Sequence, residues 1–134
     1  MKRTILVIED DEVISYILEF MLTKEGFEAE VIPDGLSALN RINGKAGAAP
    51  DGLPALVLLD VMLPHVDGRQ LISAIRASDT WREVPVLMLT SKAQEANIAE
   101  GLAAGANDYI IKPFTPADVI ARIRTHLPED KAAS

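Results

Sequence analysis

The 134-residue sequence contains no cysteine. This absence excludes disulfide frameworks, zinc fingers, iron–sulfur clusters and catalysis by a thiol. Basic residues are also few, because 13 Lys and Arg stand against 20 Asp and Glu, which gives a formal net charge of −7. A protein that binds nucleic acid needs basic residues to displace counterions from phosphates, so we expect no direct nucleic-acid binding by this chain.

Long apolar runs are missing as well. No stretch approaches the roughly 18 apolar residues of a membrane span, so we expect no membrane segment. The N-terminal apolar run, Ile5–Ile8, is followed at once by acids at positions 9–12. It is shorter than the roughly 7–15 apolar residues of a secretory signal, and we therefore expect a soluble cytoplasmic protein.

Short apolar runs alternate with amphipathic patterns along the chain. The runs with the length and composition of strands are Thr4–Ile8, Glu28–Ile32, Ala55–Leu59, Val84–Leu89 and Asp108–Ile111. Helical patterns follow them, from Val13 to Leu22, over Leu36–Ile42, Arg69–Ala77 and Ala93–Ala104, and from Pro116 onward. This alternation predicts an α/β fold in which a doubly wound parallel sheet carries helices on both faces.

The length of the chain fits one domain, at roughly 100–200 residues per domain. We expect this domain to span residues 1–128, and residues 129–134 to form a polar tail or the start of a linker. The Gly-, Ala- and Pro-rich segment 43–54 is expected to be a loop within the domain and not a boundary between domains.

Polar residues gather at the ends of several predicted strands. They are Glu9 and Asp10, Asp60, Thr90 and Ser91, and Lys112 and Pro113. A single acid after a strand often caps the next helix, but capping does not account for a set of this size. Because the carboxyl ends of parallel strands meet at one edge of the sheet, we expect these side chains to converge there.

The carboxylates of Glu9, Asp10 and Asp60 would need positive charge nearby. Two carboxylates about 4 Å apart repel by about 4 kcal/mol at an effective dielectric constant of roughly 20. Lys112 can supply one charge, and a divalent cation would supply the rest. An all-oxygen site suits Mg²⁺, and a carboxylate beside Mg²⁺, a lysine and a hydroxyl is suited to attack phosphorus.

Four sequence blocks carry a resemblance to a known family: ILVIEDDE, LVLLDVMLPHVDG, VPVLMLTS and GANDYIIKPF. In this order they resemble the receiver domain of two-component response regulators, a CheY-like superfamily, over residues 4–127. The resemblance implies a flavodoxin-like receiver fold, with a five-stranded parallel sheet in the order 2-1-3-4-5 and five helices. It also implies a switch that catalyses its own phosphorylation and dephosphorylation and is not a turnover enzyme.

In that family the acid that ends the third strand accepts a phosphoryl group from a sensor histidine kinase or a histidine phosphotransfer protein. The resemblance places this role on Asp60. It implies that Glu9, Asp10 and Asp60 bind Mg²⁺, together with the backbone carbonyl of Met62.

The ends of the fourth and fifth strands have implied roles as well. Thr90 and Lys112 are the implied contacts of the phosphoryl oxygens, and the Lys112–Pro113 peptide resembles the family's cis bond. For the switch, the resemblance implies that Thr90 swings toward the phosphoryl group and that Tyr109 rotates into the space it leaves.

The face formed by the fourth helix, fifth strand and fifth helix is the implied site of output. Its candidate charged residues are Asp108, Asp118, Arg122 and Arg124. The resemblance implies that this face binds a downstream protein or forms a homodimer, with Asp108 and Arg122 paired across a two-fold axis. Ordinary solvated helix faces explain the same charges equally well.

Other functions fit parts of this pattern. A haloacid-dehalogenase-type phosphatase would need a second Asp two positions after Asp60, where Met62 stands. A flavodoxin-like electron carrier would need a hydroxyl- and Gly-rich loop where the sequence has EDDE. A receiver fragment of a longer transcription factor and a degenerate docking module that works without phosphorylation remain as alternatives.

Overall fold

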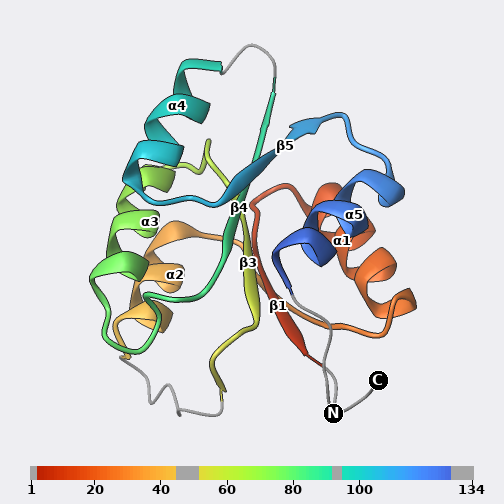
Figure 1. Cartoon of the computed structure of the whole chain (residues 1–134), viewed down its shortest axis with the longest axis horizontal. Helices are drawn as coiled ribbons and strands as arrows, with labels where there is room; N and C mark the ends of the chain where they lie inside the picture. The colour runs from red at the N-terminus through yellow and green to blue at the C-terminus, as the bar shows by residue number, and fades with distance from the viewer. Residues whose placement is uncertain (1–2, 45–51, 92–94, 128–134) are drawn as a thin grey trace.

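The structure is a computed structural model in which residues 3–44, 52–91 and 95–127 are described. Strands and helices alternate along the chain (Figure 1). The strands are β1 (Thr4–Ile8), β2 (Glu28–Ile32), β3 (Leu56–Asp60), β4 (Val86–Ser91) and β5 (Asp108–Lys112). The helices are α1 (Glu12–Lys24), α2 (Gly35–Ile42), α3 (Gly68–Ala77), α4 (Glu95–Ala104) and α5 (Pro116–His126). The predicted alternation is confirmed, and no described helix is long and apolar enough to cross a membrane.

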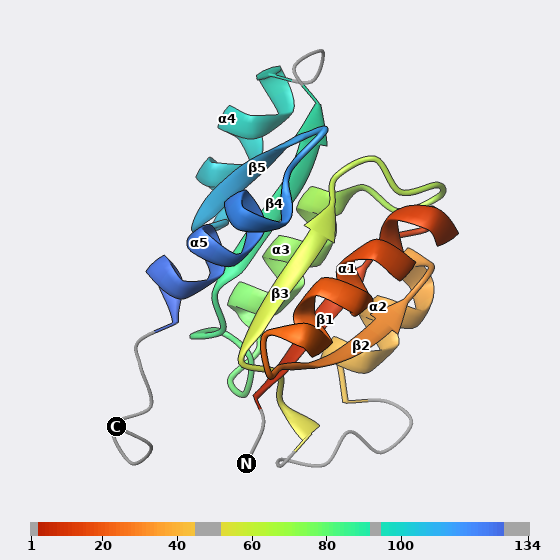
Figure 2. The same cartoon turned by 90° about the vertical axis from the view of Figure 1, so that its right-hand side faces the viewer.

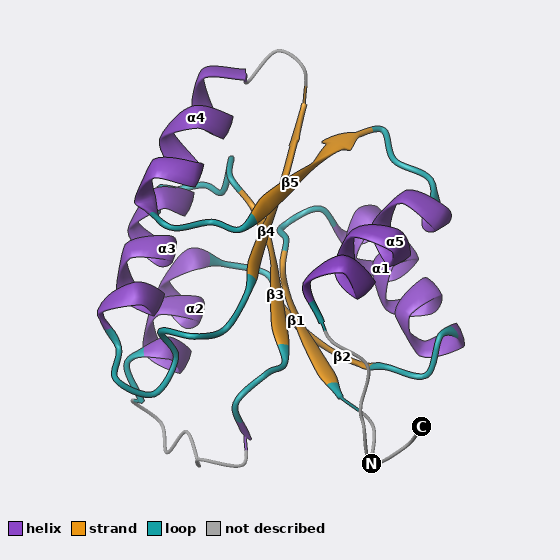
Figure 3. Cartoon of the chain, viewed as in Figure 1, coloured by secondary structure: helices purple, strands orange, loops and turns teal. Residues whose placement is uncertain are grey.

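The five strands form one parallel sheet in the order β2-β1-β3-β4-β5, which confirms the order that the resemblance implied. β1 lies between β2 and β3, with Ile5 opposite both Ala29 and Leu56. Helices α2, α3 and α4 cover one face of the sheet, and α1 and α5 cover the other (Figure 1 and Figure 3). Because all strands run in the same direction, their carboxyl ends share one edge of the sheet.

Two apolar layers hold the helices against the sheet. In β1, Leu6 and Ile8 face the layer beneath α2 and α3, while Ile5 and Val7 face the layer beneath α1 and α5. All four side chains are fully buried. A strand covered on both faces needs an unbroken apolar run, which is why the sequence of β1 does not alternate between apolar and polar residues.

Helix α1 has apolar residues on more than one side. Leu18 and Leu22 are fully buried, whereas Val13 and Ile17, which belong to the same apolar repeat in the sequence, are 68% and 44% exposed. Successive residues of a helix are rotated by about 100°, so a repeat this wide exceeds the stripe that one sheet face can cover. Figure 2 shows α1 lying beside α5 on the same face of the sheet.

Strand β4 begins at Val86, two residues after the start of the apolar run that predicts it. The N–H of Val84 donates instead to the carbonyl of Trp81 at 2.8 Å, in the preceding turn. Pro85 has no N–H to donate to the ladder, although its carbonyl accepts the N–H of Val57 at 2.9 Å. Ala93, the predicted start of the fourth helix, and the predicted tail at residues 129–134 lie outside the described residues.

Arg76, in the last turn of α3, joins this helix to the turns beside β4 and β5. Its guanidinium donates to the carbonyl oxygens of Arg82 at 2.9 Å, Val84 at 2.7 Å and Gly105 at 2.9 Å. It also donates to Oδ1 of Asn107 at 2.7 Å. The φ of Gly105 is +127°, and a Cβ there would lie 2.7 Å from Cγ of Arg76, so glycine allows this close approach.

We predict that Arg76→Met lowers the free energy of unfolding by about 1–3 kcal/mol, because it leaves several backbone carbonyls without their donor. Arg82→Met is the matched control, since it removes the same charge from an exposed side chain and keeps the Arg82 carbonyl. That control should stay within about 0.5 kcal/mol of the wild type. Urea unfolding at pH 7 measures both, and equal losses would contradict the structural role of Arg76.

Candidate functional site

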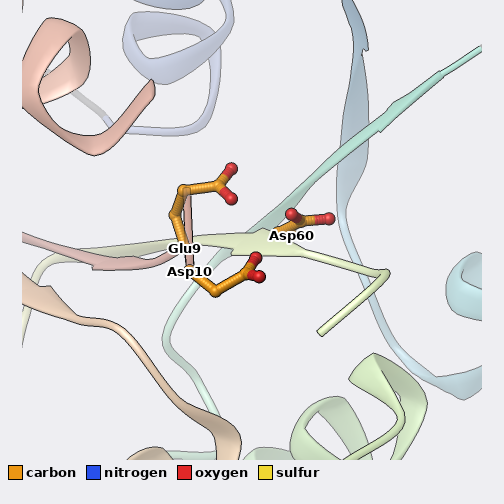
Figure 4. A group of neighbouring side chains, drawn as sticks. All are labelled: Glu9, Asp10 and Asp60. Atoms are coloured by element: carbon orange, nitrogen blue, oxygen red, sulfur yellow. The ribbon is translucent and has the colours of Figure 1, made fainter. Parts of the chain in front are cut away.

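The carboxyl edge of the sheet brings together four of the polar residues that were predicted to meet there, Glu9, Asp10, Asp60 and Lys112. Glu9 follows β1, Asp60 ends β3 and Lys112 ends β5. Nζ of Lys112 lies 3.1 Å from Oε1 of Glu9 and 3.3 Å from Oδ2 of Asp60. Ligand oxygens of Glu9, Asp10 and Asp60 all lie within 4.8 Å of one another (Figure 4).

The acids of this cluster differ in burial. Glu9 is 1% exposed and Asp60 is 6% exposed, while Asp10 is open to solvent. Burial, followed by the hydrogen bond and the charge of Asp60, raises the pKa of Glu9 to about 7. Two contacts act in the opposite direction: the N–H of Asp11, which donates to Oε2 of Glu9 at 3.1 Å, and the charge of Lys112.

Lys112 is the cation next to the two buried acids. Burial by itself lowers the pKa of Lys112, but the negative charges of Asp60 and Glu9 outweigh burial and hold this pKa above its ordinary value. Lys112 is therefore charged at neutral pH. One ammonium group cannot balance the cluster of acids when all of them are ionised.

Contacts on both oxygens hold the carboxylate of Asp60 in place. Oδ1 accepts the N–H of Met62 at 2.9 Å, and Oδ2 accepts from Lys112. The loop after Asp60 also packs tightly against α3, because a Cβ on Gly68 would lie 2.9 Å from Cα of Val61. The phosphoacceptor candidate is thus an oriented side chain on a firmly packed strand end.

The acids at positions 9–12 divide between two roles. Oδ1 of Asp11 accepts the N–H groups of Val13 at 2.9 Å and Ile14 at 3.1 Å, which makes Asp11 the N-cap of α1. The carboxylate of Asp11 is therefore engaged with the backbone N–H groups of the first turn of α1. Glu9 and Asp10 are the members of this run that lie in the cluster, as the resemblance implied.

The donor set of the cluster suits a hard divalent cation. Within the described part of the chain, Glu9, Asp10 and Asp60 are the acidic side chains close enough together to share one ion. All of the ligand atoms are carboxylate oxygens, and Mg²⁺ commonly takes a few such ligands while it keeps several waters. The three carboxylates, when ionised, carry more negative charge than Lys112 can balance, and this excess also favours a divalent cation.

Thr90 and Tyr109 lie on neighbouring strands. Thr90 is 1% exposed, and its Oγ1 donates to the carbonyl of Ser91 at 3.4 Å. Tyr109 pairs in register with Met88, two residues before Thr90, so both side chains belong to the same face of the sheet. The guanidinium of Arg122 lies 5.7 Å from the centroid of the Tyr109 ring.

The ion pair predicted across a two-fold axis forms here within one chain. Nη1 of Arg122 lies 2.7 Å from Oδ1 of Asp108, and Nε2 of His126 lies 2.9 Å from the other oxygen. The sequence did not lead us to expect the contact of His126 with Asp108, although its spacing of four residues from Arg122 on α5 was an available signal. An intermolecular pair between Asp108 and Arg122 stays a prediction.

The other two charged residues predicted on this face also have partners within the chain. Arg124 forms an ion pair with Glu25 at 3.2 Å. Asp118 takes part in the capping box of α5, where its own N–H donates to Thr115 Oγ1 at 3.1 Å. Both residues therefore have structural roles in this chain.

A further contact at the edge of the site has no signal in the sequence. Nδ2 of Asn97, in α4, donates to the sulfur of Met62 at 3.7 Å. The contact depends on where α4 packs beside the loop that follows Asp60, and spacing along the chain does not reveal such a placement.

Curated proteins match the chain over nearly its whole length. A family model described as the response regulator receiver domain covers residues 5–124. The DNA-binding response regulator MtrA of Mycobacterium tuberculosis is 39% identical over 127 residues, which are 95% of this chain and 51% of that protein. The phosphate regulon transcriptional regulatory protein PhoB of Escherichia coli is 40% identical over 124 residues, which are 92% of this chain and 51% of that protein. The chain spans about half the length of the curated relatives it matches.

Solved structures share this fold. The chemotaxis response regulator CheY4 of Vibrio cholerae matches with a TM-score of 0.82 and 27% identity, over 95% of this chain and all of that one (100%). The receiver domain of the sensor histidine kinase PA1611 of Pseudomonas aeruginosa, which has a magnesium ion coordinated in its active-site cleft, matches with a TM-score of 0.80 and 30% identity, over 93% of this chain and 97% of that one. Because the family model covers most of its length, this chain belongs to the response regulator receiver domain family.

Proposed function

We propose that Asp60 accepts a phosphoryl group from a histidine of a sensor histidine kinase or a histidine phosphotransfer protein. The observation that carries this proposal is the carboxylate of Asp60, held by the Met62 N–H and by Lys112 beside two further acids. Membership of the receiver family supports the same role.

The proposed transfer uses Asp60 as the nucleophile. One of its carboxylate oxygens forms a bond to phosphorus, while the bond from phosphorus to the donor nitrogen breaks and the imidazole leaves with the electron pair. Before the transfer, the Met62 N–H and the Lys112 ammonium hold the carboxylate at the strand end. This preorganisation reduces the entropy that must be lost when the donor arrives.

The residues that would hold Mg²⁺ are Glu9, Asp10 and Asp60, with the backbone carbonyl of Met62. The acidic cluster and the magnesium-containing receiver domain of PA1611 support this proposal. When bound, the ion supplies positive charge that offsets the charge of the phosphoryl oxygens. Lys112 already contacts Asp60, and we propose that it stays with the phosphoryl group after transfer.

We propose that the protein catalyses its own phosphorylation and dephosphorylation without being a turnover enzyme. A phosphatase that uses an Asp nucleophile would need a general acid two positions after Asp60. Met62 stands there and has no proton to give. The cluster can therefore receive and lose a phosphoryl group, but it has no second acid at that position to assist a leaving group.

We propose that Thr90 and Tyr109 transmit the phosphorylated state to the surface of α4, β5 and α5. The hydroxyl of Thr90 would donate a hydrogen bond to the phosphoryl group. Tyr109 would then turn toward the space that the Thr90 side chain leaves. Arg122 lies over the ring of Tyr109 and pairs with Asp108, so a turn of the ring would disturb that ion pair. Freed in this way, the charged residues of the face could bind a downstream protein or a second copy.

The proposed setting is a cytoplasmic signalling pathway. The receiver domain would span residues 1–128, with residues 129–134 as a polar tail or the beginning of a linker. A receiver portion of a longer DNA-binding regulator is the second candidate, because MtrA and PhoB are about twice as long and are named as DNA-binding and transcriptional regulators. Nucleic-acid binding would then belong to a segment other than this acidic chain.

We predict that the wild type gains one phosphoryl group on incubation with acetyl phosphate and Mg²⁺, whereas Asp60→Asn gains none. The amide keeps the shape of the carboxylate but is a far weaker nucleophile. Asp67→Asn is the matched control, because Asn caps a helix about as well as Asp and this residue caps α3 without belonging to the acidic cluster. Intact-mass measurement shows the adduct, and an adduct of equal yield in Asp60→Asn would disprove the assignment.

We predict that Thr90→Ala still accepts a phosphoryl group but loses at least half of the resulting chemical-shift change at Tyr109. The reason is that the hydroxyl couples the phosphoryl group to the neighbouring strand. Thr90→Ser keeps the hydroxyl and should restore the wild-type response. NMR of the Tyr109 backbone amide with and without acetyl phosphate measures this, and a full response in Thr90→Ala would exclude the proposed coupling.

A further inference from the structure

Met62 differs from the other described methionines in its exposure. Met62 is 56% exposed, whereas Met21 is 5% exposed and Met88 is fully buried. Met62 is two residues after Asp60, and its own N–H donates to the carboxylate of Asp60 at 2.9 Å. An exposed methionine therefore contacts the candidate phosphoacceptor through its backbone.

The sulfur of Met62 also faces a hydrogen-bond donor. Nδ2 of Asn97 lies 3.7 Å from it, across the gap between the loop after β3 and helix α4. Both residues line a hollow of about 220 Å³. A thioether is a weak acceptor, so this contact gives only a slight link between the loop and α4.

The same junction contains a stronger link nearby. Arg69 of α3 forms ion pairs of 2.6 Å with Asp67 and 2.6 Å with Glu100, one turn further along α4 than Asn97. These groups are more than 40% exposed, so each pair contributes little to stability. These polar contacts are weak, so one strong hydrogen bond between the loop and α4 would add to the links described here.

Oxidation of a thioether adds such an acceptor. A peroxide transfers one oxygen atom to the sulfur of Met62, which loses two electrons as the O–O bond breaks, and hydrogen peroxide leaves as water. The product, a sulfoxide, carries a strongly polar oxygen. Methionine sulfoxide reductases reverse the reaction with two thiol electrons, so the modification can act as a switch.

We propose that Met62 is a peroxide-sensitive modification site and that its sulfoxide fastens α4 to the loop after Asp60 through Asn97. The sulfoxide oxygen accepts the Asn97 amide in place of the weak sulfur contact. Oxidation then restrains α4, one of the elements of the proposed output face. This effect on signalling rests on the proposed function, whereas the modification and the new hydrogen bond do not.

The first test is the selectivity of the reaction. In the whole chain treated with dilute hydrogen peroxide, peptide mass mapping should show Met62 oxidised at least about tenfold faster than Met21 and Met88, because exposure sets access of the oxidant. Equal rates at the three residues would overturn the proposal. Met62→Leu, of similar volume, should show no oxidation at this position.

The second test is the hydrogen bond to α4. In oxidised wild type, hydrogen exchange at the amides of residues 98–104 should slow by about fivefold, the factor that one ordinary hydrogen bond contributes. Methionine sulfoxide reductase should restore the original rates. The controls are oxidised Asn97→Ala and peroxide-treated Met62→Leu. In neither variant should hydrogen exchange at these amides become slower.

Exchange rates that stay the same in oxidised wild type would overturn the link to α4, as would equal slowing in oxidised Asn97→Ala. Phosphorylation of the unoxidised wild type by acetyl phosphate is measured on the same samples. A failure of that reaction would count against the proposed function alone, because oxidation and exchange at Met62 do not require a phosphoryl group.

Discussion

Repulsion among the carboxylates of Glu9, Asp10 and Asp60 is the constraint on which the rest of this structure depends. Their oxygens lie within 4.8 Å of one another, and Lys112 contacts the two buried members. The pKa of the Glu9 carboxyl is raised to about 7, chiefly by burial and then by the hydrogen bond and charge of Asp60. The folded protein therefore binds a proton at Glu9 more tightly than the unfolded chain does, and it loses stability as the pH rises from about 4.5 toward 7. A divalent cation would remove this cost above pH 7.

The architecture supplies what this cluster needs. Parallel strands deliver the ends of β1, β3 and β5 to one edge, and apolar layers on both faces keep the strands rigid. Asp11 caps α1, which leaves Glu9 and Asp10 for the cluster. The unfavourable charge density is thus held by a large apolar core, a common arrangement at functional sites.

The predictable part of the molecule is the part that periodicity and parallel topology control. The alternation of strands and helices follows from the apolar runs and helical patterns. The convergence of Glu9, Asp60 and Lys112 follows from the parallel direction of the strands. The start of β4 differed because Pro85 interrupts donation to the ladder, which a count of apolar residues does not register. The exposure of Val13 does not follow from the sequence, since helical spacing says which residues share a side but not how wide a stripe the sheet covers.

Two contacts between side chains outside the acidic cluster were beyond prediction. The link from Asn97 to Met62 depends on the placement of α4, and the intrachain pair of Asp108 with Arg122 depends on side-chain rotamers. Neither is determined by spacing. The sequence does show which residue types stand at the strand ends. This information is enough to predict the charge of the site, but not the contacts of the side chains around it.

The most direct test of this account is Mg²⁺ binding measured by titration calorimetry at pH 6 and pH 8. If the ion relieves repulsion in this cluster, it competes with the proton on Glu9, whose pKa is about 7. Binding by the wild type should then be about tenfold tighter at pH 8 than at pH 6. Glu9→Gln, which has no proton to lose, should bind more weakly and without this difference. Wild-type affinity that is the same at both pH values, or no binding at all, would contradict the account.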